Sequence, residues 1–307
     1  MALSTIEQIY QCIDTKESFV LDAGAGSGKT WSLVESLKYI IKNNGENFNR
    51  NNQKIVCITY TNVAKNEIIE RLENNELVIV STIHDFLWNC ISQFKKELKI
   101  KLIGNIEEKI VKVQNELDNS KSKKGVTFDK NLEKKEKLES SKNELILTKN
   151  TTQYKNYFSY KNNIISHDEV IELSSSIFSS YPTIRKIVAD SYPIIFVDEY
   201  QDTNYAQQQI VLQLTKENQH VFVVGDDYQS IYAFRGANID NILNFQKIYP
   251  NCRLFKLERN YRSTQNIVAA ANSLMKHNVR QIPKDVYSEN TTGDKVTLKS
   301  AYSDKEE

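Results

Sequence analysis

The sequence predicts an α/β fold in which an inserted, mainly helical domain interrupts a parallel sheet. Short, nearly continuous apolar runs, rich in β-branched and aromatic residues, are typical of parallel strands that are covered on both faces. Amphipathic helical patterns separate most of these runs, and such alternation is typical of α/β proteins. Residues 89–189 lack the alternation and are rich in charge, which indicates an insertion between two parts of the sheet.

Six apolar runs are expected to form the strands. They are SFVLDA (18–23), IVCITY (55–60), LVIVST (77–82), IIFVDE (194–199), VFVVGD (221–226) and RLFKLE (253–258). Helices are expected at KTWSLVESLKYII (29–41) and NVAKNEIIERL (62–72). Because ligands of such sheets bind at the carboxyl ends of the strands, the residues that follow each run are the first candidates for a site.

The insertion is expected to contain an antiparallel helical hairpin. Apolar residues recur at helical spacing on both sides of the turn SKSKKG (120–125): Ile106, Ile110, Val113 and Leu117 before it, and Leu138 and Leu145 after it. This thin seam is typical of two helices packed side by side. Two interpretations stay open: a solvated arm, or an arm whose lysines contact duplex DNA or a protein partner. Residues 166–188 are expected to be a helix that leads back to the sheet.

These patterns divide the chain into three parts. Residues 1–88 and 190–259 form the sheet domain, and residues 89–189 form the inserted helical domain. Residues 260–307 hold one expected helix (263–278) and one expected strand (295–301), which is too little for a domain of its own. We therefore expect this last part to be the incomplete start of a further domain, and the chain to be a fragment of a longer protein.

Composition excludes several classes of protein. The formal net charge of the 307 residues is +1, so affinity for nucleic acid must come from a local basic face. The four cysteines are far apart and form no CxxC pair, which favours reduced thiols in a cytoplasmic protein over a zinc site or a disulfide framework. No apolar run approaches the roughly 20 residues that a membrane span needs. The start MALSTIEQIY has no basic flank before an apolar core, so no secretion signal is expected.

The stretch AGAGSGKT (23–30) predicts a phosphate site, since it lies between an expected strand and an expected helix. Backbone N–H groups of the loop can surround a β-phosphate, aided by the helix dipole. The loop residues concerned are Ala25, Gly26, Ser27 and Gly28. Lys29 would reach the β- and γ-phosphate oxygens, and Thr30 would ligate Mg²⁺. Ala23 stands at the first position, where the general pattern has Gly.

The stretch FVDEYQDTN (196–204) supplies the acids that such a site needs. Asp198, at the end of the expected strand, can hold Mg²⁺ through its waters. Glu199 beside it can accept a proton from the attacking water. The alternative is that two acids merely end a strand, but their combination with the phosphate loop favours ATP hydrolysis.

Two further stretches follow expected strands. VVGDDYQSIYAFRGA (223–237) supplies Gln229, Tyr232, Phe234 and Arg235, and LERNYRS (257–263) supplies Tyr261 and Arg262. An arginine in the second stretch could approach the γ-phosphate and stabilise charge in the transition state. The tyrosine beside it offers a flat face for a purine.

These stretches, in this order, resemble the motifs of UvrD/Rep-type superfamily 1 DNA helicases. The resemblance includes IEQIYQ (6–11), similar to an adenine-reading glutamine motif, and ITYTNVAKNEIIERL (58–72) and STIHDF (81–86), similar to motifs Ia and Ib. AGAGSGKT, FVDEYQDTN, VVGDDYQSIYAFRGA and LERNYRS resemble motifs I to IV. The resemblance to this family covers residues 1–88 and 190–290, and it implies a RecA-like P-loop parallel sheet. It also implies ATP-dependent, 3′ to 5′ movement on single-stranded DNA with strand separation.

The resemblance implies roles at the ATP site. Gln8 would bond the adenine edge, Gln229 would couple the γ-phosphate to the DNA site, and Arg262 would act as an arginine finger. Tyr261 would stack on adenine. Trp31 departs from the best-known members of the family, which place an arginine at this position. An indole can replace a guanidinium as a stacking plane, so Trp31 and Tyr261 are expected to sandwich the adenine. The alternative is that Trp31 packs beneath the loop.

The resemblance also implies a path for single-stranded DNA. Tyr60, Tyr232 and Phe234 match aromatic positions that stack on bases, which is a sequence-tolerant contact. The alternative for each ring is packing in the core. Three further residues would contact the backbone or position those rings: Thr61, His84 and Arg235. His84 is not expected to ligate a metal.

The family's second RecA-like domain carries motifs V and VI, which are absent from this sequence. We therefore expect the chain alone to bind ATP and Mg²⁺, to hydrolyse ATP slowly, and not to unwind DNA. Its expected partner is single-stranded DNA or a junction of single-stranded and duplex DNA. A second hypothesis is an ATP-dependent DNA-sensing or recruitment subunit that acts with a nuclease or with a repair or antiphage partner through the arm at residues 105–147. A small-molecule kinase is a third, weaker one.

Overall fold

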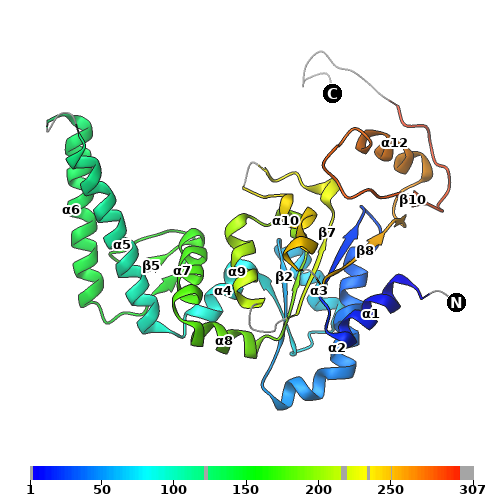
Figure 1. Ribbon diagram of the computed structural model, residues 1–307, viewed down its shortest axis with the longest axis horizontal. Coiled ribbons are helices and arrows are strands. Elements are labelled where there is room, and N and C mark those ends of the chain that lie inside the picture. Colours follow the sequence, from blue (N-terminus) through cyan, green and yellow to red (C-terminus); the bar gives the residue numbers. More distant parts are fainter. Residues whose placement is uncertain (1–2, 121–123, 216–219, 234–235, 250, 298–307) are drawn as a thin grey trace. The chain divides into compact units, whose positions relative to one another are not determined.

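The fold was analysed in a computed structural model, which describes residues 3–120, 124–215, 220–233, 236–249 and 251–297 (Figure 1). The chain forms two compact units. The first comprises residues 1–81, 191–205 and 219–307, and the second comprises residues 82–190 and 206–218. The prediction that domains divide at 88/89, 189/190 and 259/260 stays a prediction.

The first unit is built on a six-stranded sheet in the order β3-β2-β6-β7-β1-β8. The strands are β1 (Phe19–Ala23), β2 (Ile55–Thr59), β3 (Val78–Thr82), β6 (Ile194–Val197), β7 (His220–Gly225) and β8 (Arg253–Leu257). The β2–β6, β6–β7, β7–β1 and β1–β8 ladders are all parallel. All six predicted runs contain a strand, and the predicted α/β class is confirmed.

Helices and short strands complete this unit. They are α1 (Thr5–Thr15), α2 (Lys29–Arg50), α3 (Asn62–Arg71), α10 (Asp240–Leu243), α11 (Phe245–Ile248), α12 (Gln265–Met275), the 3₁₀ turns η1 (Tyr200–Asp202) and η2 (Asp227–Gln229), and the pair β9 (Arg259–Asn260) and β10 (Tyr287–Ser288). A reciprocal capping box between Ser4 and Glu7 begins α1. Of the strand predicted at 295–301, residues 295–297 have no regular structure, and residues 298–301 lie outside the described part of the chain.

Aromatic rings from adjacent strands fill the core of the first unit. Phe19 of β1 stacks on Phe222 of β7 with ring centroids 4.6 Å apart, and Phe196 of β6 lies 4.9 Å from Phe222. These three side chains are buried together with apolar residues of α1 and α2. Such close packing fixes the spacing and register of the central strands, and therefore the positions of the loops at their carboxyl ends.

The second unit is mainly helical. It contains α4 (Ile83–Ile91), α5 (Lys95–Asp118), α6 (Val126–Leu147), α7 (His167–Ser180), α8 (Pro182–Ser191), most of α9 (Tyr205–Thr215), and a two-residue pair of β4 (Gln153–Tyr154) and β5 (Ile164–Ile165). No helix in the described residues of either unit is long and apolar enough to cross a membrane.

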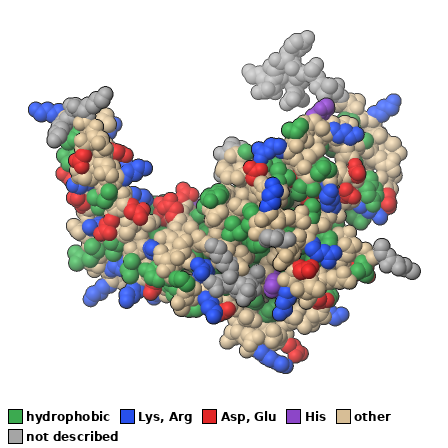
Figure 2. All heavy atoms as spheres, viewed as in Figure 1, with side chains coloured by type: hydrophobic (Ala, Val, Ile, Leu, Met, Phe, Trp, Pro, Cys, Tyr) green, Lys and Arg blue, Asp and Glu red, His purple; other side chains and the backbone are tan. Residues whose placement is uncertain are grey.

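Helices α5 and α6 lie side by side as the predicted hairpin (Figure 1). Of the predicted seam, Ile106, Val113, Leu117 and Leu145 are buried, while Ile110 and Leu138 are half-buried. Outside the seam, basic and acidic side chains are interspersed over this arm (Figure 2). The seam is narrow because only one apolar residue per turn faces the partner helix.

One predicted helix is divided into two helices in the structure. Residues 166–188 were expected to be continuous, but α7 ends at Ser180 and α8 begins at Pro182. Tyr181 between them is not helical, with φ −124° and ψ 81°. The residue before a proline avoids helical geometry, whereas proline itself suits the first position of a helix.

Candidate nucleotide-binding site

The phosphate loop lies between β1 and α2, as the sequence predicts. Gly26 and Gly28 have φ values of +67° and +93°, which favour glycine. A Cβ on Gly26 would lie 2.8 Å from Cβ of Arg262, so the loop also needs glycine for this close approach. Gly28 caps the N-terminus of α2, which leaves backbone N–H groups and the positive end of the helix dipole facing the loop.

The strand-end acids of β6 lie beside the loop lysine. Lys29 Nζ is 3.5 Å from Glu199 Oε2, although 170 positions separate the two residues. The Gln201 side-chain amide donates to the same Glu199 oxygen at 2.9 Å. Glu199 has a left-handed backbone, with φ 48° and ψ 45°. An unusual backbone held in place by its neighbours is common at functional sites.

The second acid of this pair, Asp198, is buried. Its carboxyl Oδ1 accepts a hydrogen bond from the Glu199 backbone N–H at 3.0 Å. Burial, and then the charge of Glu199, raise the pKa of Asp198 to about 7. Burial and Glu199 likewise raise the pKa of Asp202 to about 6, and one of its buried oxygens has no hydrogen-bond partner among the described residues. Carboxylates gathered in this way, with the Thr30 hydroxyl on the cavity wall, are oxygen ligands that suit Mg²⁺.

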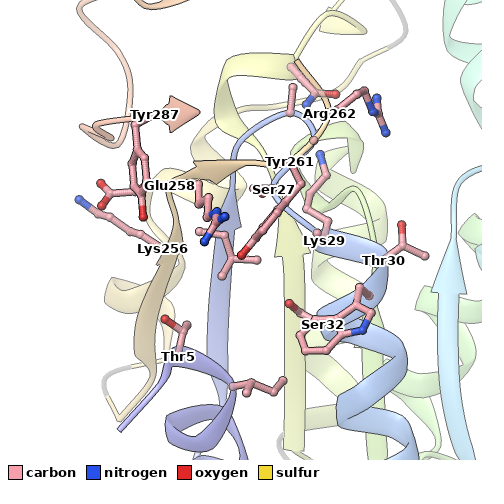
Figure 3. Close-up of a pocket in the computed structure, with 18 of the residues that line it drawn as sticks. Thr5, Ser27, Lys29, Thr30, Ser32, Lys256, Glu258, Tyr261, Arg262 and Tyr287 are labelled. Carbon is pink, nitrogen blue, oxygen red and sulfur yellow. The ribbon is translucent and has the colours of Figure 1, made fainter. Parts of the chain in front are cut away.

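A cavity of about 1110 Å³ opens over the phosphate loop. Figure 3 shows Lys29, Tyr261 and Arg262 beside it. Most of the residues predicted for the ATP site line this cavity: Ala25, Gly26, Ser27, Gly28, Lys29, Thr30, Trp31, Glu199, Gln229, Tyr261 and Arg262. Trp31 is 52% exposed and Tyr261 61% exposed, so both rings have a free surface. The exposure of Trp31 does not fit the alternative in which it packs beneath the loop.

Two residues predicted for the ATP and Mg²⁺ site do not line this cavity: one is the buried Asp198, and the other is Gln8. The Gln8 side-chain amide donates to the Leu3 carbonyl at 3.0 Å. Ser4, Thr5 and Ile6 line the cavity instead. A role for Gln8 at the adenine therefore stays a prediction that requires its side chain to leave the Leu3 carbonyl.

Several site residues were missed by the sequence analysis. Asn260 donates to the Ala25 carbonyl at 2.6 Å, and its Oδ1 accepts from the Arg262 and Ser263 N–H groups. The Tyr261 N–H also donates to the Gly26 carbonyl. Lys256, Glu258, Arg259 and Tyr287 line the cavity, and the Arg259 guanidinium lies 4.7 Å from the Tyr261 ring centroid. The position of residues 256–260 at the carboxyl end of β8 was the signal that could have found most of them.

Among the residues predicted to bind DNA, Tyr60 and Tyr232 lie together. Their rings are stacked with centroids 6.3 Å apart and an interplanar angle of 14°. Thr61 caps α3, since its hydroxyl accepts from the Ala64 N–H at 3.2 Å. Phe234 and Arg235 lie outside the described residues.

His84 belongs to the second unit, on α4. Its ring lies 4.8 Å from that of His167, and burial, together with His167, lowers the pKa of His84. The imidazole is therefore neutral at physiological pH and can act there as a hydrogen-bonding or stacking group but not as a cation.

The phosphate loop, Lys29 and the strand-end acid Glu199 line one cavity, an arrangement that defines the class of P-loop nucleotide-binding proteins. Residues 4–250 match the UvrD/REP helicase N-terminal domain, and residues 255–307 match the UvrD-like helicase C-terminal domain. The chain belongs to the UvrD/REP helicase family. The resemblance expected from the motifs is thus confirmed.

Curated relatives include two ATP-dependent DNA helicases named PcrA. The one from Leuconostoc citreum is 32% identical over 95% of this chain and 42% of its own length. The one from Bacillus subtilis is 33% identical over 92% of this chain and 41% of its own length. The Gabija protein GajB of Bacillus cereus is 28% identical over 91% of this chain and 50% of its own length. The chain thus spans half or less of the length of these relatives.

The raised pKa of Asp198 leads to a prediction about how substitution of this residue changes stability at different pH values. Because the folded protein holds this proton more tightly than the unfolded chain does, the contribution of Asp198 to the free energy of unfolding falls as pH rises from about 4 to about 7. Asp198→Asn removes the buried charge and keeps the acceptor for the Glu199 N–H. In EDTA and without nucleotide, we expect its Tm to exceed that of the wild type by a few degrees at pH 8, with the gap closing toward pH 4.

Differential scanning fluorimetry across this pH range measures the effect. Asp294→Asn, at an exposed carboxylate, is the matched control and should show no such pH-dependent gap. A lower Tm for Asp198→Asn at pH 8, or a gap that does not change with pH, would contradict the account.

Proposed function

We propose that this chain carries the ATP site and part of the single-strand path of an ATP-dependent DNA helicase that moves 3′ to 5′ on single-stranded DNA. The observation that carries the proposal is the meeting of Lys29 and Glu199 on one cavity wall with Gln229 and Arg262. Family membership supports the reaction, and the named activity of the PcrA relatives supports the substrate.

The residues of the cavity have distinct roles in hydrolysis. Loop N–H groups and Lys29 hold the β- and γ-phosphates, while Thr30 and Asp198 would hold Mg²⁺. When bound, the ion neutralises charge on the phosphate oxygens. Glu199, oriented by Gln201, accepts the proton of the attacking water. Arg262 stabilises charge that develops on the γ-phosphate, as arginine fingers do in other phosphoryl-transfer enzymes.

Two aromatic side chains are proposed to hold the base. Trp31 and Tyr261 line the same cavity with exposed rings, and Arg259 lies against the Tyr261 ring. Adenine between the rings would gain stacking on both faces, and the guanidinium would keep Tyr261 from turning away. Gln8 is proposed to read the adenine edge.

Single-stranded DNA is proposed to stack on Tyr60 and Tyr232, whose parallel rings support the assignment. Base–aromatic stacking is worth about 1–3 kcal/mol per base and tolerates any sequence. Phe234 would add a third ring, and Thr61, His84 and Arg235 would contact the strand or position the rings. A net charge of only +1 agrees with DNA binding that relies on base stacking as well as on phosphate contacts.

A second candidate is an ATP-dependent DNA-sensing or recruitment subunit that acts with a nuclease, repair or antiphage partner. The similarity to the Gabija protein GajB and the exposed arm of α5 and α6 favour it. DNA-stimulated turnover without strand separation by the whole protein would support this candidate over the helicase.

Substitutions in the cavity test the proposed reaction. Lys29→Ala should abolish ATP binding, because the triphosphate loses its main cation. Glu199→Gln should keep binding and lower DNA-stimulated turnover at least about a hundredfold, because the general base is lost. Nucleotide binding and phosphate release report the two steps, and Glu46→Gln, an exposed change on α2, serves as the control. Full turnover in Glu199→Gln would remove this residue as the base.

Tryptophan fluorescence tests the base site, since the chain has two tryptophans. Trp88→Phe leaves only Trp31, whose emission should change when ATP is added because adenine stacks on the indole. Trp31→Phe leaves Trp88 of α4 and should give no such change. An unchanged Trp31 signal at saturating ATP would count against the sandwich.

A further inference from the structure

A buried cluster of four charged side chains lies at the ends of β1 and β7. Lys284 Nζ donates to Asp22 Oδ1 at 2.6 Å, to Asp226 Oδ1 at 2.8 Å and to Asp227 Oδ1 at 2.6 Å. The lysine side chain is fully buried, and the three carboxylates are at most 1% exposed. All three donors of the ammonium are thus satisfied by carboxylates.

The cluster keeps Lys284 charged in spite of its burial. Burial alone would lower the pKa of Lys284, but the carboxylates of Asp226, Asp22 and Asp227 outweigh burial and raise it. The Tyr228 ring adds a cation–π contact, with its centroid 4.1 Å from Nζ. Loss of the ammonium would leave three carboxylates close together without water, which is strongly unfavourable.

Lys284 belongs to a segment that is tied to the sheet on both sides of the cluster. The Ile282 N–H donates to Asp227 Oδ2 at 2.5 Å, and the Asp285 N–H donates to Glu258 Oε1 at 3.0 Å. This segment lies within residues 255–307, which match the C-terminal domain of the family. Asp22 and Asp226 lie within residues 4–250, which match the N-terminal domain.

Asp226 joins the cluster to the nucleotide cavity. Its second oxygen, Oδ2, accepts from Gln229 Nε2 at 2.6 Å, and Gln229 lines the cavity. Its backbone N–H donates to Gln201 Oε1 at 3.0 Å, and the Gln201 amide bonds Glu199. Lys284 is therefore two contacts away from the residue proposed to couple the γ-phosphate to DNA.

We propose that Lys284 is a positioning residue for ATP hydrolysis, whose ammonium fixes the Asp226 carboxylate and thereby holds Gln229 at the nucleotide cavity. The inference rests on the proposed ATPase function. The competing explanation is that the cluster only stabilises the fold. The two differ in turnover per folded molecule, since a purely structural cluster would lower the Tm and leave that turnover unchanged.

A double-mutant cycle between Lys284 and Gln229 tests whether Lys284 acts on hydrolysis through Gln229. In DNA-stimulated ATP hydrolysis by the full chain, Lys284→Gln should lower kcat by roughly tenfold to a hundredfold, as misplacement of a catalytic group does, with KM changed less than about threefold. In the Gln229→Ala background, the same substitution should lower kcat only a little further. The proposal would be overturned if Lys284→Gln lowered kcat by the same factor with and without Gln229→Ala, or if Lys284→Gln left kcat unchanged. Lys276→Gln, an exposed change after α12, is the control.

A second pair of variants keeps the test decisive if Lys284→Gln does not fold. Asp22→Asn leaves the contact between Lys284 and Asp226 in place and should keep kcat within about threefold. Adding Lys284→Met to it restores the formal charge of the cluster and should reproduce the loss of kcat. The same kcat in the single and double variants would contradict the proposal. Turnover that survives Lys29→Ala would instead defeat the proposed ATPase function, so the two failures are distinguishable.

Discussion

The structure depends on one topological constraint: parallel strands end at the same edge of their sheet. The order β6-β7-β1-β8 places four chain segments next to one another at that edge. The phosphate loop follows β1, the acids Asp198 and Glu199 follow β6, Gln229 follows β7, and Arg262 follows β8. Residues as far apart in the sequence as Lys29 and Glu199 therefore meet at this edge. The packed rings of Phe19, Phe196 and Phe222 hold the strands in register and so hold the site together.

Gathering acids at one edge has an electrostatic cost, which two lysines reduce in different ways. Lys29 faces the cavity, where it lies near Glu199 and can contact phosphate oxygens instead. Lys284 is fully buried and bonded to three carboxylates, so it cannot exchange partners as easily. Lys29 is thus suited to exchange its contact with Glu199 for one with the nucleotide. Lys284 is suited to hold the surrounding carboxylates in fixed positions. Burial nevertheless raises the pKa of Asp198 and of Asp22 to about 7, so both groups retain a stability cost at neutral pH.

The parts that could be predicted from the sequence are those with local signals. Apolar runs predicted all six strands, and the motifs predicted the phosphate loop, the strand-end acids and half of the residues that line the cavity. The break before Pro182 was missed because the apolar pattern continues across it, although proline itself was a signal. The Lys284 cluster had no local signal, since its lysine and Asp22 are 262 positions apart and Asp22 lies within an apolar run. Asn260 was missed because its side chain serves the backbone of a distant loop and carries no chemistry of its own.

The most direct test of the account is a crystal structure of the protein with Mg²⁺ and a non-hydrolysable ATP analogue. The account predicts the β-phosphate within the N–H groups of the loop, Lys29 Nζ on phosphate oxygens, and the adenine ring between Trp31 and Tyr261. It also predicts the metal on the Thr30 hydroxyl, with Asp198 holding its waters. A triphosphate bound away from this loop, with the contact between Lys29 and Glu199 unchanged, would contradict it.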